Sequence, residues 1–285
     1  MHDFRQLLTQ AGFRLRPPAT VRSLANLVTE LCLPIPDGLR GLWLTSDGAS
    51  RADMELLSVT GAQEYGDAMS GAGLIPFTDC NDSNPYVVSG RGPLMNYIVH
   101  VQHDGDTNLI CSDLERFLEL VSDAGEEVDQ LVSDYAMDSP DRTPEDAEIA
   151  RALLRDAIET EMDDWYRNNS LRFAAQLFGA GDEAALAEVM AAGNEYTRDA
   201  VRERWVGMDT DAARRLLAAD DATYRRFLDD LRRAFESAGV RTESDRDEFV
   251  LLVGRVGLDF RMLYADRLRQ GAMSDCVERF RKQLK

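Results

Sequence analysis

Apolar residues in the first half of the chain follow two different spacings. Val21, Leu24, Leu27, Val28 and Leu31 recur at steps of three and four, which predicts a helix. Shorter apolar and β-branched runs at 54–59, 86–88, 97–103 and 107–111 predict strands. The last two runs flank Asp104-Gly105-Asp106, a hairpin turn signal because Asp and Gly tolerate positive φ. We therefore expect an α+β domain, in which helices pack on a small sheet.

The second half has the pattern of an all-helical domain. Apolar positions from Tyr224 to Phe235 and from Phe249 to Leu263 fall on single helical faces. All nine prolines lie at or before Pro144, and proline breaks helix interiors. We interpret 139–144 as a linker, with Thr143 capping the next helix, and expect domains at 1–138 and 143–285.

Several polar residues are expected to start helices. Ser112-Asp113-Leu114-Glu115 has the capping-box pattern and precedes the apolar residues Leu114, Phe117, Leu118 and Val121. In the second half the expected caps are Ser170, Asp182, Thr210 and Asp220.

The charge of the chain is strongly acidic and unevenly distributed. The formal net charge is −19. Residues 1–140 hold 21 acids and 8 bases, a net of −13, whereas residues 141–285 hold 30 acids and 24 bases, a net of −6. Such acidity disfavours nucleic acid and favours steering of a basic partner, although solubility alone also explains it. No apolar run is long enough to span a bilayer, and four scattered cysteines suggest a reducing compartment, so we expect a cytoplasmic protein.

The sequence contains two weak candidates for metal binding. His100 and His103 have an H-x-x-H spacing, but on a strand they would point to opposite faces. Residues 79–84 are rich in Asp and Asn, but position twelve of a calcium loop would be Gly90, and a polar turn is favoured. There is no phosphate-binding loop, and the few histidines offer little for a catalytic triad. We expect no catalytic, cofactor or metal site, while an enzyme of unrecognised type stays open.

The order of motifs from Leu33 to Val121 resembles the SUKH superfamily of Smi/Knr-like domains. The resemblance rests on Leu33-Pro34-Ile35-Pro36 leading to Trp43 and Asp47-Gly48, on Gly73-Leu74-Ile75-Pro76-Phe77 before the polar segment 78–85, and on the hairpin-like 97–111 before an amphipathic helix. The polar segment lacks the glycine common in the family and has Pro85 instead. The helical half resembles no family.

The SUKH resemblance implies a non-enzymatic immunity protein that binds and blocks a cognate bacterial toxin. The expected partner is a basic toxin domain, with no nucleic acid, membrane or cofactor involved; the oligomeric state is left open. The alternative is a regulatory or scaffolding module in a bacterial signalling or defence system. The expected partner-binding residues lie in polar loops: Asp79, Asp82, Asn84, Tyr86, Asp104 and Asp106.

Overall fold

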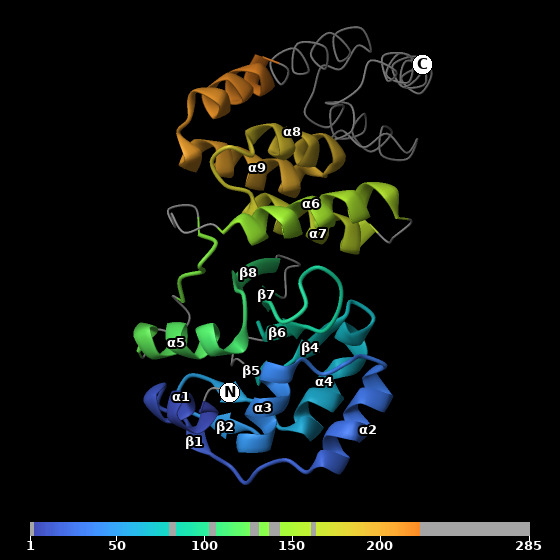
Figure 1. Cartoon of the computed structure of the whole chain (residues 1–285), viewed down its shortest axis with the longest axis vertical. Helices are drawn as coiled ribbons and strands as arrows, with labels where there is room; N and C mark the ends of the chain where they lie inside the picture. The colour runs from blue at the N-terminus through green and yellow to red at the C-terminus, as the bar shows by residue number, and fades with distance from the viewer. Residues whose placement is uncertain are drawn as a thin grey trace, which may run out of the picture. The chain divides into compact units, whose positions relative to one another are not determined.

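The computed structural model describes residues 3–79, 84–102, 107–125, 131–136, 143–160 and 164–222 (Figure 1). The chain divides into two compact units, Met1–Phe178 and Gly179–Lys285, and each is described here by itself. The helices predicted at 224–235 and 249–263 lie outside the described residues.

The first unit is an α+β structure, as the sequence predicts. Its elements in chain order are α1 (Phe4–Gln10), β1 (Arg14–Leu15), α2 (Val21–Leu31), α3 (Asp37–Thr45), β2 (Ala49–Ser50), β3 (Glu55–Leu56), α4 (Val59–Ser70), β4 (Leu74–Pro76), β5 (Thr78–Asp79), β6 (Tyr86–Ser89), β7 (Ile98–Val101), β8 (Thr107–Cys111), α5 (Leu114–Ala124), α6 (Pro144–Glu159) and α7 (Asp164–Leu177).

The described part of the second unit is helical. It contains α8 (Glu183–Ala192), α9 (Glu195–Met208) and helical residues 211–222. In both units together, the residues that the structure describes include no helix with the length and apolar character needed to cross a membrane.

Two antiparallel sheets meet where Phe77 and Thr78 bond to Tyr86. Their strand orders are β1-β2-β3-β5 and β4-β6-β7-β8. Between β4 and β5, the Phe77 N–H donates to Tyr86 O at 3.4 Å, while Phe77 O accepts from Leu57 N at 2.8 Å. One stretch of chain therefore passes from the second sheet to the first, and Phe77 bonds to both.

The core of the first unit lies where α5 and α3 cover this junction. α5 buries Leu114, Phe117, Leu118 and Val121, which form one face of the helix. The Phe117 ring lies 5.2 Å from the Phe77 ring and 5.0 Å from the Tyr86 ring. Such burial is worth about 1.5–3 kcal/mol for each fully buried large apolar side chain. The strand junction is thus a well-packed support for the polar residues on either side of it.

The structure confirms several of the predicted elements. The helix at Val21–Leu31, the strand containing 86–88 and the antiparallel pairing of β7 with β8 are all present. Thr143 caps α6, with its side chain accepting from Asp146 N. Asp182 and Thr210 also stand at helix starts, since Asp182 precedes α8 and Thr210 Oγ1 accepts from Ala213 N at 3.0 Å.

Other local predictions are wrong. The strand expected at 54–59 is only Glu55–Leu56, because Ser58 accepts from Gly61 N and starts α4 at Val59. The cap of α5 is Asp113, which accepts from Arg116 N, and not Ser112.

Two predicted caps lie inside helices instead. Ser170 is within α7, and Asp220 is within the helical residues 211–222, where it pairs with Arg202 at 2.7 Å. A polar side chain inside a helix is tolerated when it is partly exposed, as for Ser170, or when it is paired, as for the largely buried Asp220 side chain.

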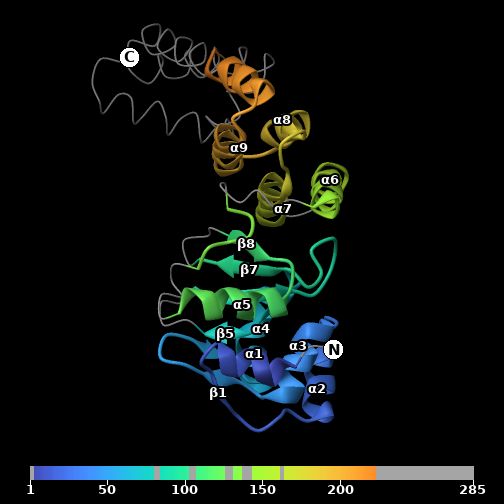
Figure 2. The ribbon, with the colours of Figure 1, turned by 60° about the vertical axis from the view of Figure 1, so that its left-hand side comes forward.

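The boundary between the compact units differs from the predicted linker. α6 and α7, which lie side by side in Figure 2, belong to the first unit and not to the second. α7 packs against β8, and Gln176 Oε1 accepts from Leu109 N at 2.8 Å. The change in proline content thus marks where helices begin, but the units divide at Phe178. Independent folding of 1–138 and 143–285 stays a prediction.

Candidate partner-binding surface

Asp79 is an exposed carboxylate at the end of β5. β5 is the last strand in the order of the first sheet, and Asp79 pairs in register with Glu55 of β3. Glu55 is half-exposed and accepts from Arg16 at 2.7 Å, whereas Asp79 has no ion-pair partner among the described residues. Two carboxylates in one cross-strand pair repel each other, so this position favours an incoming positive charge.

Asn84 and His100 join the end of the polar segment to β7. His100 Nε2 lies 3.2 Å from Asn84 O. A carbonyl oxygen only accepts, so Nε2 carries the hydrogen in this contact. Both residues are half-buried, and the bond fixes the backbone of Asn84 directly before β6.

Tyr86 does not lie on an exposed loop, and that expectation is wrong. Its side chain is 5% exposed, stacks on the His100 ring at 4.5 Å and contacts Phe117. The Tyr86 N–H donates to Thr78 Oγ1 at 2.7 Å. The residue begins β6, whose four residues are all buried, and its ring packs in the core.

Three of the predicted partner-binding residues, Asp82, Asp104 and Asp106, lie outside the described residues, as does His103. Of the predicted set, the structure therefore brings together Asn84 and Tyr86 through His100, and places Asp79 in the adjoining strand. Across the described ranges, no group of three or more His, Cys, Asp or Glu residues could hold a metal ion.

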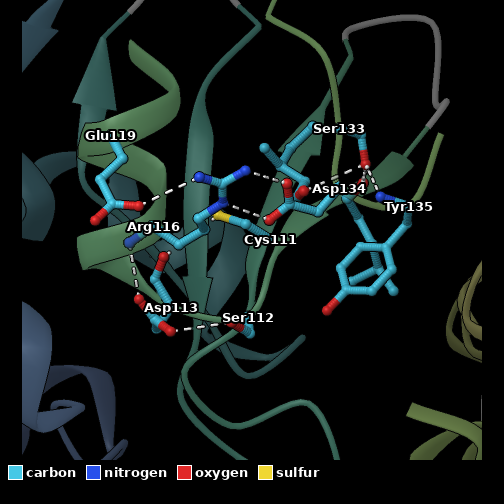
Figure 3. A network of polar contacts seen from close by, with 10 residues as sticks. Cys111, Ser112, Asp113, Arg116, Glu119, Ser133, Asp134 and Tyr135 are labelled. Atoms are coloured by element: carbon cyan, nitrogen blue, oxygen red, sulfur yellow. Dashed lines mark hydrogen bonds and ion pairs between the residues drawn. The ribbon is translucent and has the colours of Figure 1, made fainter. Parts of the chain in front are cut away.

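A second polar network, missed from the sequence, joins α5 to residues 131–136 (Figure 3). Arg116 donates to both carboxylate oxygens of Asp134, from Nε at 2.9 Å and from Nη2 at 2.8 Å, and also to Glu119 at 3.2 Å. The Asp134 hydrogen bonds raise the pKa of Arg116. Its two bonds to one carboxylate give a fixed geometry that a single lysine would not reproduce. No sequence spacing identifies this pair, because a segment of chain separates its members.

Two tyrosines converge on one carboxylate beside this network. Asp146 Oδ1 accepts from Tyr97 Oη at 3.3 Å and from Tyr135 Oη at 3.4 Å, and Asp146 Oδ2 accepts from Thr143 N at 2.8 Å. Burial raises the pKa of Tyr97 to about 12 and is also the largest cause of the raised pKa of Tyr135. Both phenols therefore stay protonated near neutral pH and donate to Asp146.

Cys111 lies next to these groups as a buried thiol. Burial raises its pKa well above the ordinary value, and the nearby Asp134 carboxylate adds to that shift. A thiol is a weak nucleophile until it loses its proton. Cys111, Tyr97 and Tyr135 thus keep their protons near neutral pH, and the hydrogen bonds of the two phenols fix structure. The sequence analysis found only Thr143 of this cluster, as a helix cap; the capping box that Thr143 forms with Asp146 is a signal that could have pointed to Asp146 as well.

The sequence matches no protein-family model, and a comparison with the curated proteins finds no significant match. The SUKH resemblance therefore stays a prediction.

Proposed function

We propose that this chain is a non-enzymatic, cytoplasmic immunity protein of the SUKH type that binds a basic toxin domain and blocks its active site. The observation that carries the proposal is the position of Asp79, exposed in β5 opposite Glu55. A regulatory or scaffolding role is the alternative, in which the same surface recruits another protein.

The charge distribution supports a basic partner. The first 140 residues have a net charge of −13, and within the described ranges Asp79 is an exposed carboxylate with no ion-pair partner. Excess charge of one sign raises the rate at which an oppositely charged protein is captured, with an effect that fades over a Debye length of about 8 Å at physiological salt. Steering of the toxin domain toward β5 would be followed by steric cover of its active site.

The firm support beneath Asp79 also favours binding. Phe77 precedes β5 and is fully buried against Phe117, and Thr78 holds the start of β6 through its hydroxyl. An exposed residue on a fixed strand loses less conformational entropy on binding than one on an unsupported loop. The raised pKa values of Cys111, Tyr97 and Tyr135 fit a non-enzymatic role, because catalysis needs groups poised near the working pH.

The experiment is affinity capture from the source cells followed by a growth test. The wild-type chain, Asp79→Lys and the matched control Glu188→Lys, an exposed acid on α8, serve as bait. We expect a basic toxin domain to be captured by the wild type and by Glu188→Lys, and far less by Asp79→Lys. Co-expression with the captured protein should restore growth in the same order. Capture of a protein that does not inhibit growth would favour the regulatory alternative, and capture of nothing would contradict both.

A further inference from the structure

β8 is an edge strand, since no strand of the part of the chain that the structure describes lies on its outer side. It stands last in the order β4-β6-β7-β8, and it is mostly buried, with Thr107, Leu109, Ile110 and Cys111 shielded from solvent. An uncharged apolar edge with open backbone groups is a ready template for pairing with another strand. The chain must therefore protect this edge or use it.

Residues 131–136, which we call the strap, occupy part of the outer side of β8. Ser133 Oγ donates to Leu109 O at 2.5 Å, and the Asp134 N–H donates to Ile110 O at 2.8 Å. On the same edge the Leu109 N–H donates to Gln176 Oε1 of α7 at 2.8 Å. The strap and α7 thus supply the partners that a neighbouring strand would supply.

α7 makes further side-chain contacts along β8. Gln176 Nε2 donates to Asn108 Oδ1 at 3.0 Å, and the Thr107 hydroxyl donates to Asn169 Oδ1. Asn169 and Gln176 are seven residues apart, about two turns, so they share one face of the helix. Amide side chains that present both a donor and an acceptor imitate the backbone of a strand.

A bulge in β8 accompanies this cover. Ile98 pairs with Cys111 while Val99 pairs with Leu109, so Ile110 has no residue opposite it. A bulge turns an additional carbonyl outward and disturbs the regular ladder that a second strand would need. The strap satisfies this Ile110 carbonyl through the Asp134 N–H, in addition to the Leu109 carbonyl.

Two sets of side-chain contacts hold the strap in place. Arg116 of α5 donates two hydrogen bonds to Asp134, and Tyr135 donates to Asp146 at the start of α6. Tyr135 also stacks on Tyr97 at 6.1 Å, with the rings 24° from parallel. The side chain of Asp146 is buried, so this second set of contacts is shielded from solvent.

We propose that the strap and α7 close the β8 edge against a second copy of this chain. Without them, β8 of one molecule would pair with β8 of another, since identical edges associate around a two-fold axis. This inference goes beyond the proposed function, and it concerns a different surface from Asp79.

The test uses the full chain carrying Ser133→Ala together with Gln176→Ala. The molar mass is measured by size-exclusion chromatography with light scattering over a concentration series. We expect self-association to strengthen by about ten- to thirtyfold relative to wild type, because the two substitutions leave the N–H and the carbonyl of Leu109 without their side-chain partners in the closed form. The matched control is Gln10→Ala with Ser122→Ala, which lie exposed on α1 and α5, and it should behave as wild type.

A charge on the edge distinguishes β8 pairing from general unfolding. Asn108→Lys added to the double variant should restore the wild-type mass, because a lysine on an edge strand blocks strand addition. Association that persists with Asn108→Lys, or a double variant with the wild-type mass at every concentration, would overturn the proposal. If circular dichroism shows the double variant to be unfolded, the molar mass of Ser133→Ala is measured instead, with and without Asn108→Lys. Stronger self-association that Asn108→Lys reverses supports the proposal, and a wild-type mass or association that persists with Asn108→Lys overturns it.

Discussion

Asp146 allows the energetics of the first unit to be tested with a single substitution. Its carboxylate is 5% exposed and accepts from the backbone N–H and the hydroxyl of Thr143 and from the phenols of Tyr97 and Tyr135. Asp146→Ala removes all four acceptor contacts at once. Each phenol has a single hydrogen and donates it to Asp146; once that carboxylate is removed, one phenol can donate to the other, so the substitution leaves one phenol short of an acceptor and not both.

The expected loss follows from these contacts. Removal of a capping interaction at a helix start costs about 0.5–2 kcal/mol. A buried donor left without an acceptor costs about 1–3 kcal/mol. Asp146→Ala should therefore lower the free energy of unfolding of the first unit by roughly 3 kcal/mol. Asp146→Asn keeps one acceptor oxygen and should cost roughly 1 kcal/mol.

Hydrogen exchange across a urea titration measures this loss in the full chain. The exchange is followed by mass spectrometry in peptides from β7, β8 and α6, so that the second unit does not contribute. Asp156→Ala is the matched control, because Asp156 is an exposed acid on the same helix, and its effect should stay within about 0.5 kcal/mol. If Asp146→Ala lowers the free energy of unfolding by less than about 1 kcal/mol, or by as much as Asp156→Ala does, the contacts of Asp146 do not stabilise the first unit as expected.

Three further predictions concern pH and the unit boundary. The pKa of Tyr97 rises from 10.0 to about 12 on folding, so its contribution to stability is complete below pH 10 and is lost as the pH rises through 12. Tyr97→Phe should therefore remove one tyrosinate absorbance step near pH 12 and flatten the dependence of stability on pH in that range. Hydrogen bonds, chiefly from the Thr210 hydroxyl, lower the pKa of Glu183 below 4.5, so its contribution to stability is complete above pH 4.5 and is lost as the pH falls through the lowered pKa. Glu183→Gln should therefore make the stability of the second unit, measured by hydrogen exchange, less dependent on pH in the acid range. A chain of residues 1–178 should melt cooperatively in calorimetry at a higher temperature than a chain of residues 1–138, because the shorter chain lacks Asp146 and Gln176. Equal melting temperatures would contradict the assignment of α6 and α7 to the first unit.

Regular periodicity and local caps predicted the elements whose signals lie within a short stretch of sequence. α2 follows from its apolar spacing, and α6 follows from Thr143 and Pro144. α4 was missed because glycines within it weaken intrinsic helix preference. A Cβ atom at Gly66 would meet the end of the Leu31 side chain of α2, which would have to shift. The glycine therefore lets these two helices pack closely, a tertiary contact that periodicity does not reveal.

The residues of the candidate partner-binding surface were also predicted only in part. Polar composition predicted exposure correctly for Asp79 but not for Tyr86, because the strand directs that ring toward Phe117. The Asp134 pair with Arg116 and the convergence of Tyr97 and Tyr135 on Asp146 depend on tertiary contacts between segments far apart in sequence. Neither periodicity nor a short motif carries that information.

The association rate of the captured toxin domain with three forms of the chain shows whether a basic partner docks at β5. Stopped-flow rates at several salt concentrations are compared for the wild type, Asp79→Lys and Glu188→Lys, since a reversed charge near a docking surface acts mainly on the association rate. We expect Asp79→Lys to slow association about three- to tenfold at low salt and to weaken its salt dependence, with little change in melting temperature. Glu188→Lys should stay near the wild-type rate. Equal slowing by both variants, or no slowing by Asp79→Lys, would contradict the docking of a basic partner at β5.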